Sequence, residues 1–381
     1  MVRSVEAVVV GGGITGASLR LHLERAGHEV LLLESRELAA GATGRNAGFL
    51  IQGVAENYES AVQRYGRAQA ADLWRFTRAC HEELAAALAE SDVEYRRCGS
   101  WTAAASAAEA AELRRSETML REDGFEVRWH ESVASLPPGY HGALLNPTDA
   151  EIDSGAAVRA LAMMGAGEVA TGAEVTSFEA RPGAVVVGSS RGEIHARRVF
   201  IATNAWAGRL VPGAPIEPVR GQALLTEPIS ALVADRCVYA DRGFQYWRQR
   251  RDGALLVGGW RNVAMSQEVG FDETPTEAVQ GHLDAHLARL RVDAPVARRW
   301  AGVMGFTPDH LPLVGAAPSA PGVFLCAGYS GHGMGFAFRA ARLLVESLAG
   351  GEPLPAWMSP ARFASKPVGQ ELQREGQTQV P

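Results

Sequence analysis

A glycine-rich stretch near the N-terminus has the spacing of a dinucleotide-binding turn. Residues 11–16 read Gly-Gly-Gly-Ile-Thr-Gly, which places Gly11, Gly13 and Gly16 at the three positions of a GxGxxG motif. The first glycine makes a tight turn, the second lets backbone N–H groups approach a pyrophosphate, and the third allows close helix–strand packing. Glu34 follows roughly 20 residues later, where a carboxylate can accept both ribose hydroxyls. The motif predicts a dinucleotide without a 2′-phosphate, which leaves FAD and NAD.

The elements that must hold this motif lie on either side of it. Residues 5–10 and 30–33 are short apolar runs typical of buried parallel strands. Residues 17–26 predict a helix, because Leu19 and Leu23 recur at helical spacing and a glycine follows its end. Strand, glycine turn, helix and strand form a Rossmann-type βαβ unit. Its helix would offer unpaired N–H groups and a positive dipole end to the phosphates.

The remaining chain alternates between helical and strand patterns, and a length of 381 residues predicts two domains. Residues 215–259 carry strand and hairpin signals that indicate an antiparallel sheet, distinct from the nucleotide-binding domain. The last third returns to an α/β pattern. Expected helices lie at 58–90, 104–123, 154–164 and 336–348, and expected strands at 174–178, 184–188, 199–202, 223–226, 245–248, 254–257 and 323–326.

Composition excludes several functions. The only lysine is Lys366, near the C-terminus, which excludes a Schiff base in the core and a Walker A lysine. A net charge of −6 without a basic tract gives no indication of a nucleic-acid partner. No apolar run reaches the roughly 18 residues of a membrane span, and no signal peptide is evident. Four cysteines without a CxxC pair predict neither zinc nor a disulfide framework and favour a cytoplasmic location: Cys80, Cys98, Cys237 and Cys326.

Further motifs follow one another along the chain. They are residues 41–48 (GATGRNAG), 199–206 (VFIATNAW), 218–222 (PVRGQ), 300–309 (WAG to TPD) and 327–335 (AGYSGHGMG). With the glycine turn, they resemble the D-amino-acid oxidase (DAO) superfamily, which contains glycine oxidase, sarcosine oxidase and the γ-glutamylputrescine oxidoreductases. The resemblance spans nearly the whole chain. It implies an α/β fold, with a Rossmann-type FAD-binding domain (GR2/DAO-like) and an antiparallel β-sheet substrate domain.

The resemblance also implies which residues bind FAD. The glycine turn and Glu34 would hold the ADP half, the loop at 41–48 would line the pyrophosphate or ring, and Val175 would meet the adenine through its backbone. Residues 329–334 would lie along the isoalloxazine, where a glycine-rich turn entering a helix aims N–H dipoles at a centre that becomes anionic. The expected contacts are Gly11, Gly13, Ile14, Thr15, Gly16, Glu34, Ser35, Arg36, Ala42, Thr43, Arg45, Asn46, Ala47, Gly48, Val175, Thr203, Asn204, Trp206, Gly302, Gly328, Tyr329, Ser330, Gly331, His332, Gly333 and Met334.

The sequence departs from the family's pattern at several positions. Members with covalent flavin use a Cys near the Thr-Pro-Asp stretch or a His near the early loop, and neither is present, so we expect non-covalent FAD. Met304 stands where glycine-oxidase-like members place an Arg that binds the substrate carboxylate. The lysine that sarcosine-oxidase-like members place beside the flavin has no counterpart. The substrate and the choice between oxidase and dehydrogenase therefore stay open.

Three residues are candidates for catalysis or substrate binding. His332 lies in the flavin loop, Tyr246 matches a substrate-facing tyrosine of the glycine oxidase pattern, and Arg220 could bind a carboxylate. Arg248 and Arg261 are other arginines of the predicted substrate sheet. Each arginine could equally be a structural or surface charge, and the two other residues could have purely structural roles.

These features predict an FAD-dependent oxidoreductase that oxidises a C–N bond of an amine or amino acid. Hydride would pass to flavin N5, the imine would hydrolyse, and oxygen or another acceptor would take the electrons. Two alternatives stay open: a 2-hydroxy-acid dehydrogenase with His332 as general base, and a non-catalytic flavin subunit of a complex. The predicted FAD-binding domain comprises residues 1–90, 152–215 and 301–364, the substrate domain 91–151 and 216–300, and a loose tail 365–381.

Overall fold

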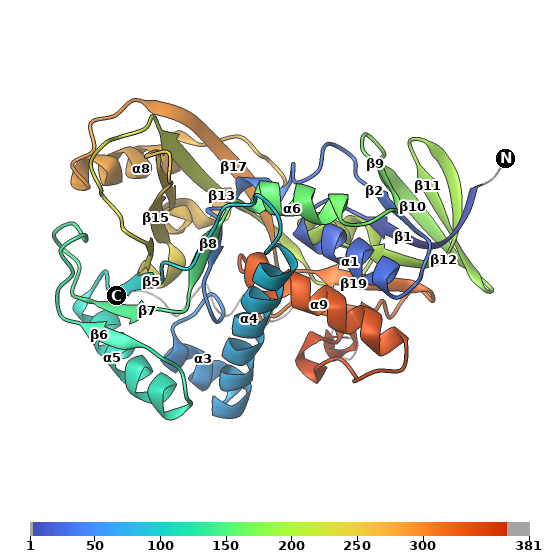
Figure 1. Ribbon diagram of the computed structural model, residues 1–381, viewed down its shortest axis with the longest axis horizontal. Coiled ribbons are helices and arrows are strands. Elements are labelled where there is room, and N and C mark those ends of the chain that lie inside the picture. Colours follow the sequence, from blue (N-terminus) through green and yellow to red (C-terminus); the bar gives the residue numbers. More distant parts are fainter. Residues whose placement is uncertain (1–2, 364–381) are drawn as a thin grey trace. The chain divides into compact units, whose positions relative to one another are not determined.

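The computed structural model describes residues 3–363, which form two compact units (Figure 1). Unit 1 contains the residues up to Gly44, Ser154–Val219 and the residues from Met304 on, and unit 2 contains Arg45–Asp153 and Arg220–Val303. The predicted boundaries near 152, 215 and 301 fall close to these, but the predicted first segment ran to residue 90, whereas that of unit 1 ends at Gly44. The predicted tail lies outside the described residues. Which unit binds cofactor and which binds substrate stays a prediction.

Unit 1 is built on a sheet with a parallel centre. Its order is β10-β11-β12-β1-β2-β9, and β19 pairs with the last residues of β12 and with β18. Strands β9, β2, β1, β12 and β19 are parallel, so the carboxyl ends of β1, β2 and β12 lie at one edge, where α/β sheets bind ligands. The strands are β1 (Arg3–Val10), β2 (Val30–Leu33), β9 (Glu168–Ala170), β10 (Val175–Arg181), β11 (Ala184–Ser189), β12 (Gly192–Ile201), β18 (Leu313–Ala316) and β19 (Val323–Ala327).

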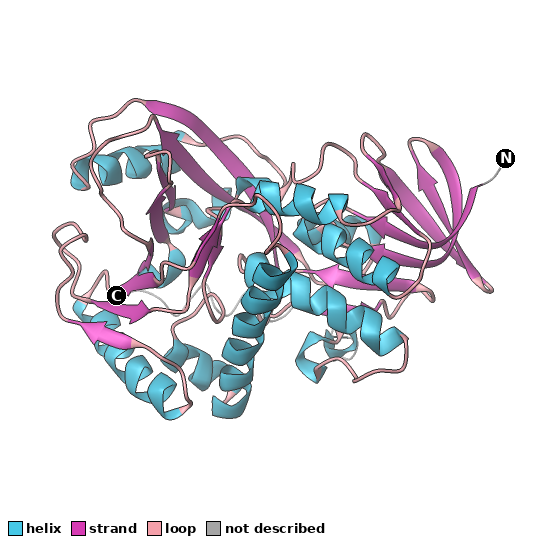
Figure 2. Ribbon diagram, viewed as in Figure 1, coloured by secondary structure: helices cyan, strands magenta, loops and turns pink. Residues whose placement is uncertain are grey.

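Helices of unit 1 pack on one another beside this sheet (Figure 2). Helix α1 (Ile14–Arg25) follows β1 and contacts both α6 (Ser154–Met163) and α9 (Gly333–Leu348). The core is formed by fully buried aliphatic side chains of β1, β2, β12 and β19, among them Val8, Leu31, Val199 and Val323. The short helices are α2 (Ala42–Arg45), which ends in the first residue of unit 2, α7 (Ala207–Leu210), and the 3-10 turns η1 (Asn204–Trp206), η4 (Ala356–Met358) and η5 (Pro360–Phe363).

Unit 2 contains two sheets. The larger has the order β17-β13-β16-β15-β14-β5-β7-β6, and the smaller has the order β3-β8-β4. Most pairs are antiparallel, as predicted, but β14 and β5 run parallel. The strands are β3 (Phe49–Leu50), β4 (Tyr95–Arg96), β5 (Ser100–Ala103), β6 (Arg128–His130), β7 (Ala143–Asn146), β8 (Ala150–Ile152), β13 (Glu217–Thr226), β14 (Cys237–Ala240), β15 (Gln245–Gln249), β16 (Leu255–Gly259) and β17 (Val296–Phe306). The first residues of β13 and the last residues of β17 belong to unit 1.

The helices of unit 2 are interrupted where the backbone requires it. The segment expected to be helical over 58–90 divides into α3 and α4, because Gly66 adopts φ +82° and stops the first helix. Helix α5 begins after Ser106, whose hydroxyl accepts the N–H of Glu109 at 3.1 Å. Within residues 3–363 no helix has the length and apolar character needed to cross a membrane. The elements are α3 (Tyr58–Tyr65), α4 (Arg67–Ala87), α5 (Ala107–Glu122), η2 (Asp241–Gly243), η3 (Arg261–Gln267) and α8 (Glu277–Arg289).

Candidate functional site: the glycine turn of unit 1 and the tyrosine pair of unit 2

The turn between β1 and α1 is shaped by contacts that exclude side chains. Gly11 has φ +109°, and a Cβ there would lie 2.8 Å from the carbonyl oxygen of Ala202, just after β12. A Cβ on Gly16 would collide with the carbonyl oxygen of Gly11. A Cβ on Gly13 would lie 3.0 Å from the hydroxyl oxygen of Thr43. The start of α1 is therefore held against β1 and the end of β12 by glycines, and it presents bare backbone.

Glu34 directly follows β2 and lies beside this turn. One carboxylate oxygen accepts the N–H of Gly12 at 2.6 Å. The other accepts the N–H of Arg36 at 2.8 Å and the hydroxyl of Ser35 at 3.2 Å. These bonds fix the carboxylate, and the oxygens retain lone pairs for further donors. A vicinal pair of ribose hydroxyls is a suitable donor pair for such a group.

Thr43 closes the opposite side of the turn. Its hydroxyl accepts the N–H of Ile14, the first residue of α1, at 3.1 Å. The preceding loop is fastened by two backbone bonds, from Ala39 N–H to the Gly12 carbonyl and from Gly44 N–H to the Ala39 carbonyl, both at 2.9 Å. The start of the predicted pyrophosphate loop is thus tied to the glycine turn.

Asn204 and Ser330 stabilise a second pair of loops in unit 1. Asn204 has φ +45°, and its side-chain oxygen accepts the N–H of Gly328 at 3.0 Å. Ser330 has φ +49°; it donates its N–H to the Gly305 carbonyl at 2.8 Å, and its hydroxyl accepts the N–H of Thr307 at 3.3 Å. Positive φ at two residues other than glycine is the local strain often found at ligand sites.

Tyr329 and His332 lie in the loop from β19 to α9. The Tyr329 hydroxyl accepts a hydrogen bond from the Thr15 hydroxyl at 3.2 Å and lies 3.3 Å from the Cys326 sulfur. Its ring is buried, so Tyr329 would meet a ligand through its backbone. His332 directly precedes α9, and burial lowers its pKa to about 4. Its imidazole is therefore neutral at pH 7 and is a weak base.

The residues of unit 1 fit the ADP part of FAD. The glycine turn leaves room for a pyrophosphate at the N-terminus of α1, and Glu34 is placed for a ribose. Backbone bonds from Gly172 to Arg36 (3.0 Å) and from Ala173 to Glu34 (2.8 Å) bring the segment leading to Val175 to the end of β2. Unit 1 holds these predicted contacts: Gly11, Gly13, Ile14, Thr15, Gly16, Glu34, Ser35, Arg36, Ala42, Thr43, Val175, Thr203, Asn204, Trp206, Gly328, Tyr329, Ser330, Gly331, His332, Gly333 and Met334.

The remaining predicted FAD contacts belong to unit 2, where Arg45 is fastened to β17. Its guanidinium donates to the Ala301 carbonyl and pairs with Glu273, each at 2.9 Å, and its carbonyl accepts the indole N–H of Trp300 at 2.8 Å. A Cβ on Gly302 would lie 3.1 Å from the Arg45 Cβ. The Glu273 and Trp300 contacts were not predicted, since a separation of more than 200 residues gives no local signal. The residues are Arg45, Asn46, Ala47, Gly48 and Gly302.

Tyr246 and Arg261 share one region of unit 2. Tyr246 on β15 pairs in register with Tyr239 on β14, and burial raises its pKa to about 12. Arg261 follows β16 closely, and its guanidinium carbon lies 4.6 Å from the centroid of the Phe244 ring. Burial lowers its pKa, while the two nearby tyrosines act in the opposite direction. A guanidinium remains charged under these conditions, and a half-buried cation beside phenols binds a carboxylate more strongly than an exposed one does.

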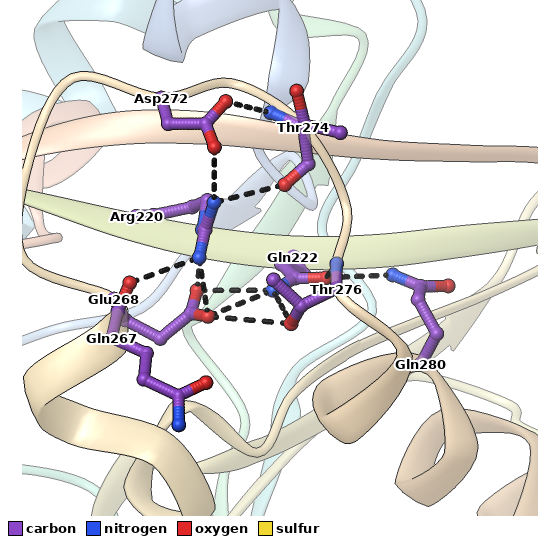
Figure 3. Close-up of polar contacts among 8 residues, drawn as sticks. All are labelled: Arg220, Gln222, Gln267, Glu268, Asp272, Thr274, Thr276 and Gln280. Atoms are coloured by element: carbon purple, nitrogen blue, oxygen red, sulfur yellow. Dashed lines mark hydrogen bonds and ion pairs between the residues drawn. The ribbon is translucent and has the colours of Figure 1, made fainter.

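The structure gives Arg220 a role different from the predicted one (Figure 3). Its Nε and Nη2 each donate to the buried carboxylate of Glu268 at 2.9 Å. Nη1 donates to Asp272 at 3.1 Å and to the Thr274 carbonyl at 3.0 Å, and Nη2 also donates to the Gln267 carbonyl at 3.0 Å. Every guanidinium nitrogen therefore has an acceptor in the protein. Arg220 fastens the segment after η3 to β13, and these contacts argue against the predicted role in binding a substrate carboxylate.

Comparison with known proteins identifies the family of this chain. Residues 6–347 match the family DAO, FAD dependent oxidoreductase. The glycine oxidase of Pseudomonas aeruginosa is 31% identical over 94% of this chain and 99% of its own length. The 4-methylaminobutanoate oxidase (formaldehyde-forming) of Paenarthrobacter nicotinovorans is 29% identical over 92% of this chain, which spans 44% of that protein. The structure of glycine oxidase from Geobacillus kaustophilus gives a TM-score of 0.81 at 22% identity, covering 96% of this chain and all of the other.

The α/β fold and the glycine turn together are those of a flavoenzyme with a Rossmann-type domain. The chain belongs to the DAO family of FAD-dependent oxidoreductases. The predicted fold class, the cofactor FAD and the superfamily are confirmed. The predicted class of activity, oxidation of an amine or amino acid at a C–N bond, is confirmed at that level by the family and by the relatives named above.

Proposed function

We propose that the enzyme uses non-covalently bound FAD to oxidise the C–N bond of a small amine or amino acid that carries a carboxylate. The observation that carries this proposal is the glycine turn with Glu34, which fits FAD in a chain of the DAO family. Two relatives are named for glycine and for 4-methylaminobutanoate, and both compounds combine an amine with a carboxylate. When bound, FAD supplies the two-electron acceptor, and the imine product hydrolyses in water.

Residues of unit 1 would hold the cofactor. The N-terminus of α1 would face the pyrophosphate, and Glu34 would accept the ribose hydroxyls. The N-terminus of α9, a helix of 16 residues that begins at Gly333, would place a positive dipole end toward the negative charge of the reduced ring. The early loop reads Arg45-Asn46, and no cysteine lies between Cys237 and Cys326, which supports non-covalent binding.

The alternative of a 2-hydroxy-acid dehydrogenase is not favoured. Hydride loss from a C–OH carbon requires a general base for the hydroxyl, and the candidate was His332. With a pKa lowered to about 4, His332 is a weak base at neutral pH, which argues against this role.

Arg261 is our candidate for the substrate carboxylate, with Tyr246 beside it. We expect Arg261→Met to raise KM for carboxylate-bearing substrates by about 10- to 100-fold, the loss of one or two charge-assisted hydrogen bonds. An amine without a carboxylate should be oxidised equally well by both proteins. Arg251→Met in the exposed turn after β15 is the matched control. An equal effect of Arg261→Met on both kinds of substrate would show that Arg261 is structural.

The electron acceptor and the location belong to the same proposal. No lysine lies among residues 3–363 to promote reaction with oxygen. The electron acceptor is therefore either oxygen or a separate compound, and the experiment below distinguishes the two. All four cysteines are free thiols, which supports a cytoplasmic location.

The test begins with the purified FAD-loaded protein under anaerobic conditions. Amines, amino acids and 2-hydroxy acids are added singly while the flavin absorbance is followed. We expect bleaching by an amine or amino acid with a carboxylate; air then restores the colour and yields peroxide if oxygen is the acceptor, whereas an artificial dye restores it otherwise. Acid precipitation should leave the flavin in the supernatant. Bleaching by hydroxy acids alone would overturn the C–N assignment, and a flavin that no compound reduces would favour a non-catalytic subunit.

A further inference from the structure

Unit 2 contains a cluster of two cysteines and a carboxylate that the proposed oxidation does not use. The sulfur atoms of Cys98 and Cys237 and a carboxylate oxygen of Glu151 all lie within 4.8 Å of one another. The Cys237 sulfur lies 3.5 Å from Glu151 Oε2, and the Cys98 sulfur lies 3.4 Å from the Gly99 carbonyl.

Strand register brings these residues together. In the small sheet Arg96 on β4 pairs with Glu151 on β8, and in the large sheet Cys237 on β14 pairs with Ser100 on β5. Cys98 lies on the short connection between β4 and β5. Gly99 turns the chain there with φ +74°, and its N–H is fixed by the Asp149 carbonyl at 2.9 Å. The two thiols therefore meet at the junction of the two sheets of unit 2.

The charges around the cluster disfavour a metal cation. Arg96 binds Glu151 Oε1 through Nε at 2.9 Å and Nη2 at 2.7 Å, and Arg248 Nη1 lies 3.7 Å from the same oxygen. Two guanidinium groups thus face one carboxylate, which leaves positive charge close to the sulfur atoms. A divalent cation would have to lie beside both arginines, which repel it, and the arginines already occupy one oxygen of Glu151.

The two cysteines are not equivalent. Cys98 is partly exposed, and its pKa is lowered, chiefly by the hydrogen bond from the Cys237 thiol; burial and Glu151 oppose this shift, and the Arg96 guanidinium supports it. Cys237 is buried, and burial raises its pKa well above the ordinary value. A partly exposed thiol of lowered pKa beside a buried thiol is the arrangement of an attacking and a resolving cysteine.

We propose that Cys98 and Cys237 are a peroxide-sensitive thiol pair that closes to a reversible disulfide. In the first step the Cys98 thiolate attacks hydrogen peroxide: an S–O bond forms, the O–O bond breaks, and hydroxide leaves. The sulfur is oxidised by two electrons to sulfenic acid, and the peroxide oxygens are reduced. In the second step the Cys237 sulfur displaces the hydroxyl of Cys98: the S–S bond forms, the S–O bond breaks, and the thiol proton leaves with the hydroxyl as water.

The proposal stands apart from the substrate and acceptor of the flavin reaction, since its oxidant is added peroxide. The full-length protein is reduced, exposed to hydrogen peroxide, alkylated and analysed by peptide mass spectrometry. We expect a Cys98–Cys237 cross-link that dithiothreitol removes. Cys80 and Cys326 are both buried, so they should remain thiols and react with the alkylating reagent only after the protein is unfolded. In Cys237→Ser the reaction should stop at a sulfenic acid on Cys98 that dimedone labels, and in Cys98→Ser no label should appear.

Charge provides a second readout. In the Cys237→Ser background, Arg96→Met should slow dimedone labelling by about 10-fold, since the thiolate loses its cationic neighbour. Arg121→Met on the exposed face of α5 is the control and should change nothing. Absence of the cross-link, equal oxidation of Cys80, or stoichiometric zinc in the reduced protein that Cys98→Ser removes would each overturn the proposal.

Discussion

At Arg220 two opposite charges are buried together, and this sets the cost of separating them. The side chains of Arg220 and Glu268 are 5% and 0% exposed. Arg220→Met would leave the Glu268 carboxylate in the interior without its cation, so we expect a loss of about 3–5 kcal/mol in the free energy of unfolding. The equivalent change in an exposed pair, Arg75→Met beside Asp72, should cost at most about 1 kcal/mol. Urea denaturation of both variants measures this, and a stable Arg220→Met enzyme with a raised KM would restore the substrate-binding role.

Glu34 should control how tightly FAD is held. Glu34→Gln retains the shape but loses the charge that strengthens hydrogen bonds from ribose hydroxyls, so we expect the Kd for FAD to rise by at least about 10-fold. Fluorescence titration of the apoprotein with FAD measures the change. Glu37→Gln, three residues on and exposed, is the control, and an unchanged Kd in Glu34→Gln would remove Glu34 from the cofactor site.

The residues that could be predicted are those whose chemistry is local. The glycines and Glu34 were predicted as cofactor contacts because a turn that needs bare backbone and a carboxylate after the second strand leave a signal within one βαβ unit. The structure brings the turn and the carboxylate together, and their contact with FAD stays a prediction. Arg220 was misjudged because its partner, Glu268, is 48 residues away. An isolated arginine in a sequence looks the same whether its partner is a substrate or a carboxylate of the fold.

Among the elements, α1 and α8 offer a contrast between two helical glycines. A Cβ on Gly16 in α1 would collide with the Gly11 carbonyl, whereas a Cβ on Gly281 in α8 would meet nothing within 4 Å. Gly16→Ala should push α1 off β1 and abolish FAD retention. Gly281→Ala should raise the free energy of unfolding by about 0.5–1 kcal/mol, because alanine favours the helix. Flavin content and thermal melting of the two proteins test this, and normal flavin content in Gly16→Ala would contradict it.

Element types were more predictable than their ends. Four of the five parallel strands of unit 1 were predicted, at least in part, from their apolar runs, since strands covered on both faces have no polar side. The short strand β9 was not predicted. The interruption at Gly66 was not predicted, because a glycine in a helical pattern can either continue the helix or end it. Only its φ of +82° shows that it ends the helix. The parallel pairing of β5 with β14 could not be predicted, since a pairing across more than 130 residues leaves no pattern in either strand.

For the whole molecule, buried histidines make stability depend on pH. Burial lowers the pKa of His22 and His332 to about 4 and that of His81 and His286 to about 3. These values lie below the unfolded value of 6.5, so the unfolded chain binds more protons, and stability falls as pH falls below about 6.5. Asp149 acts oppositely: its pKa is raised to about 7, so the stability it contributes at low pH is lost as pH rises from about 4 to 7.

The effect of four histidines exceeds that of one aspartate. We therefore expect the urea concentration at the unfolding midpoint to be lower at pH 5 than at pH 7. His286 lies between Trp247 and Trp260. His286→Phe should reduce the slope of the free energy of unfolding against pH by up to about 1.4 kcal/mol per pH unit. A midpoint that stays constant over this range would contradict the assignment of neutral buried imidazoles.

The two units are assembled from interleaved segments, and this has a consequence for biosynthesis. The last residues of β12 pair with β19, which is more than 120 residues further along the chain. While the ribosome is still making unit 2, one edge of the unit 1 sheet is therefore open, and an open apolar edge is a template for aggregation. Until β19 emerges, the last residues of β12 therefore lack the partner strand that they have in the finished sheet.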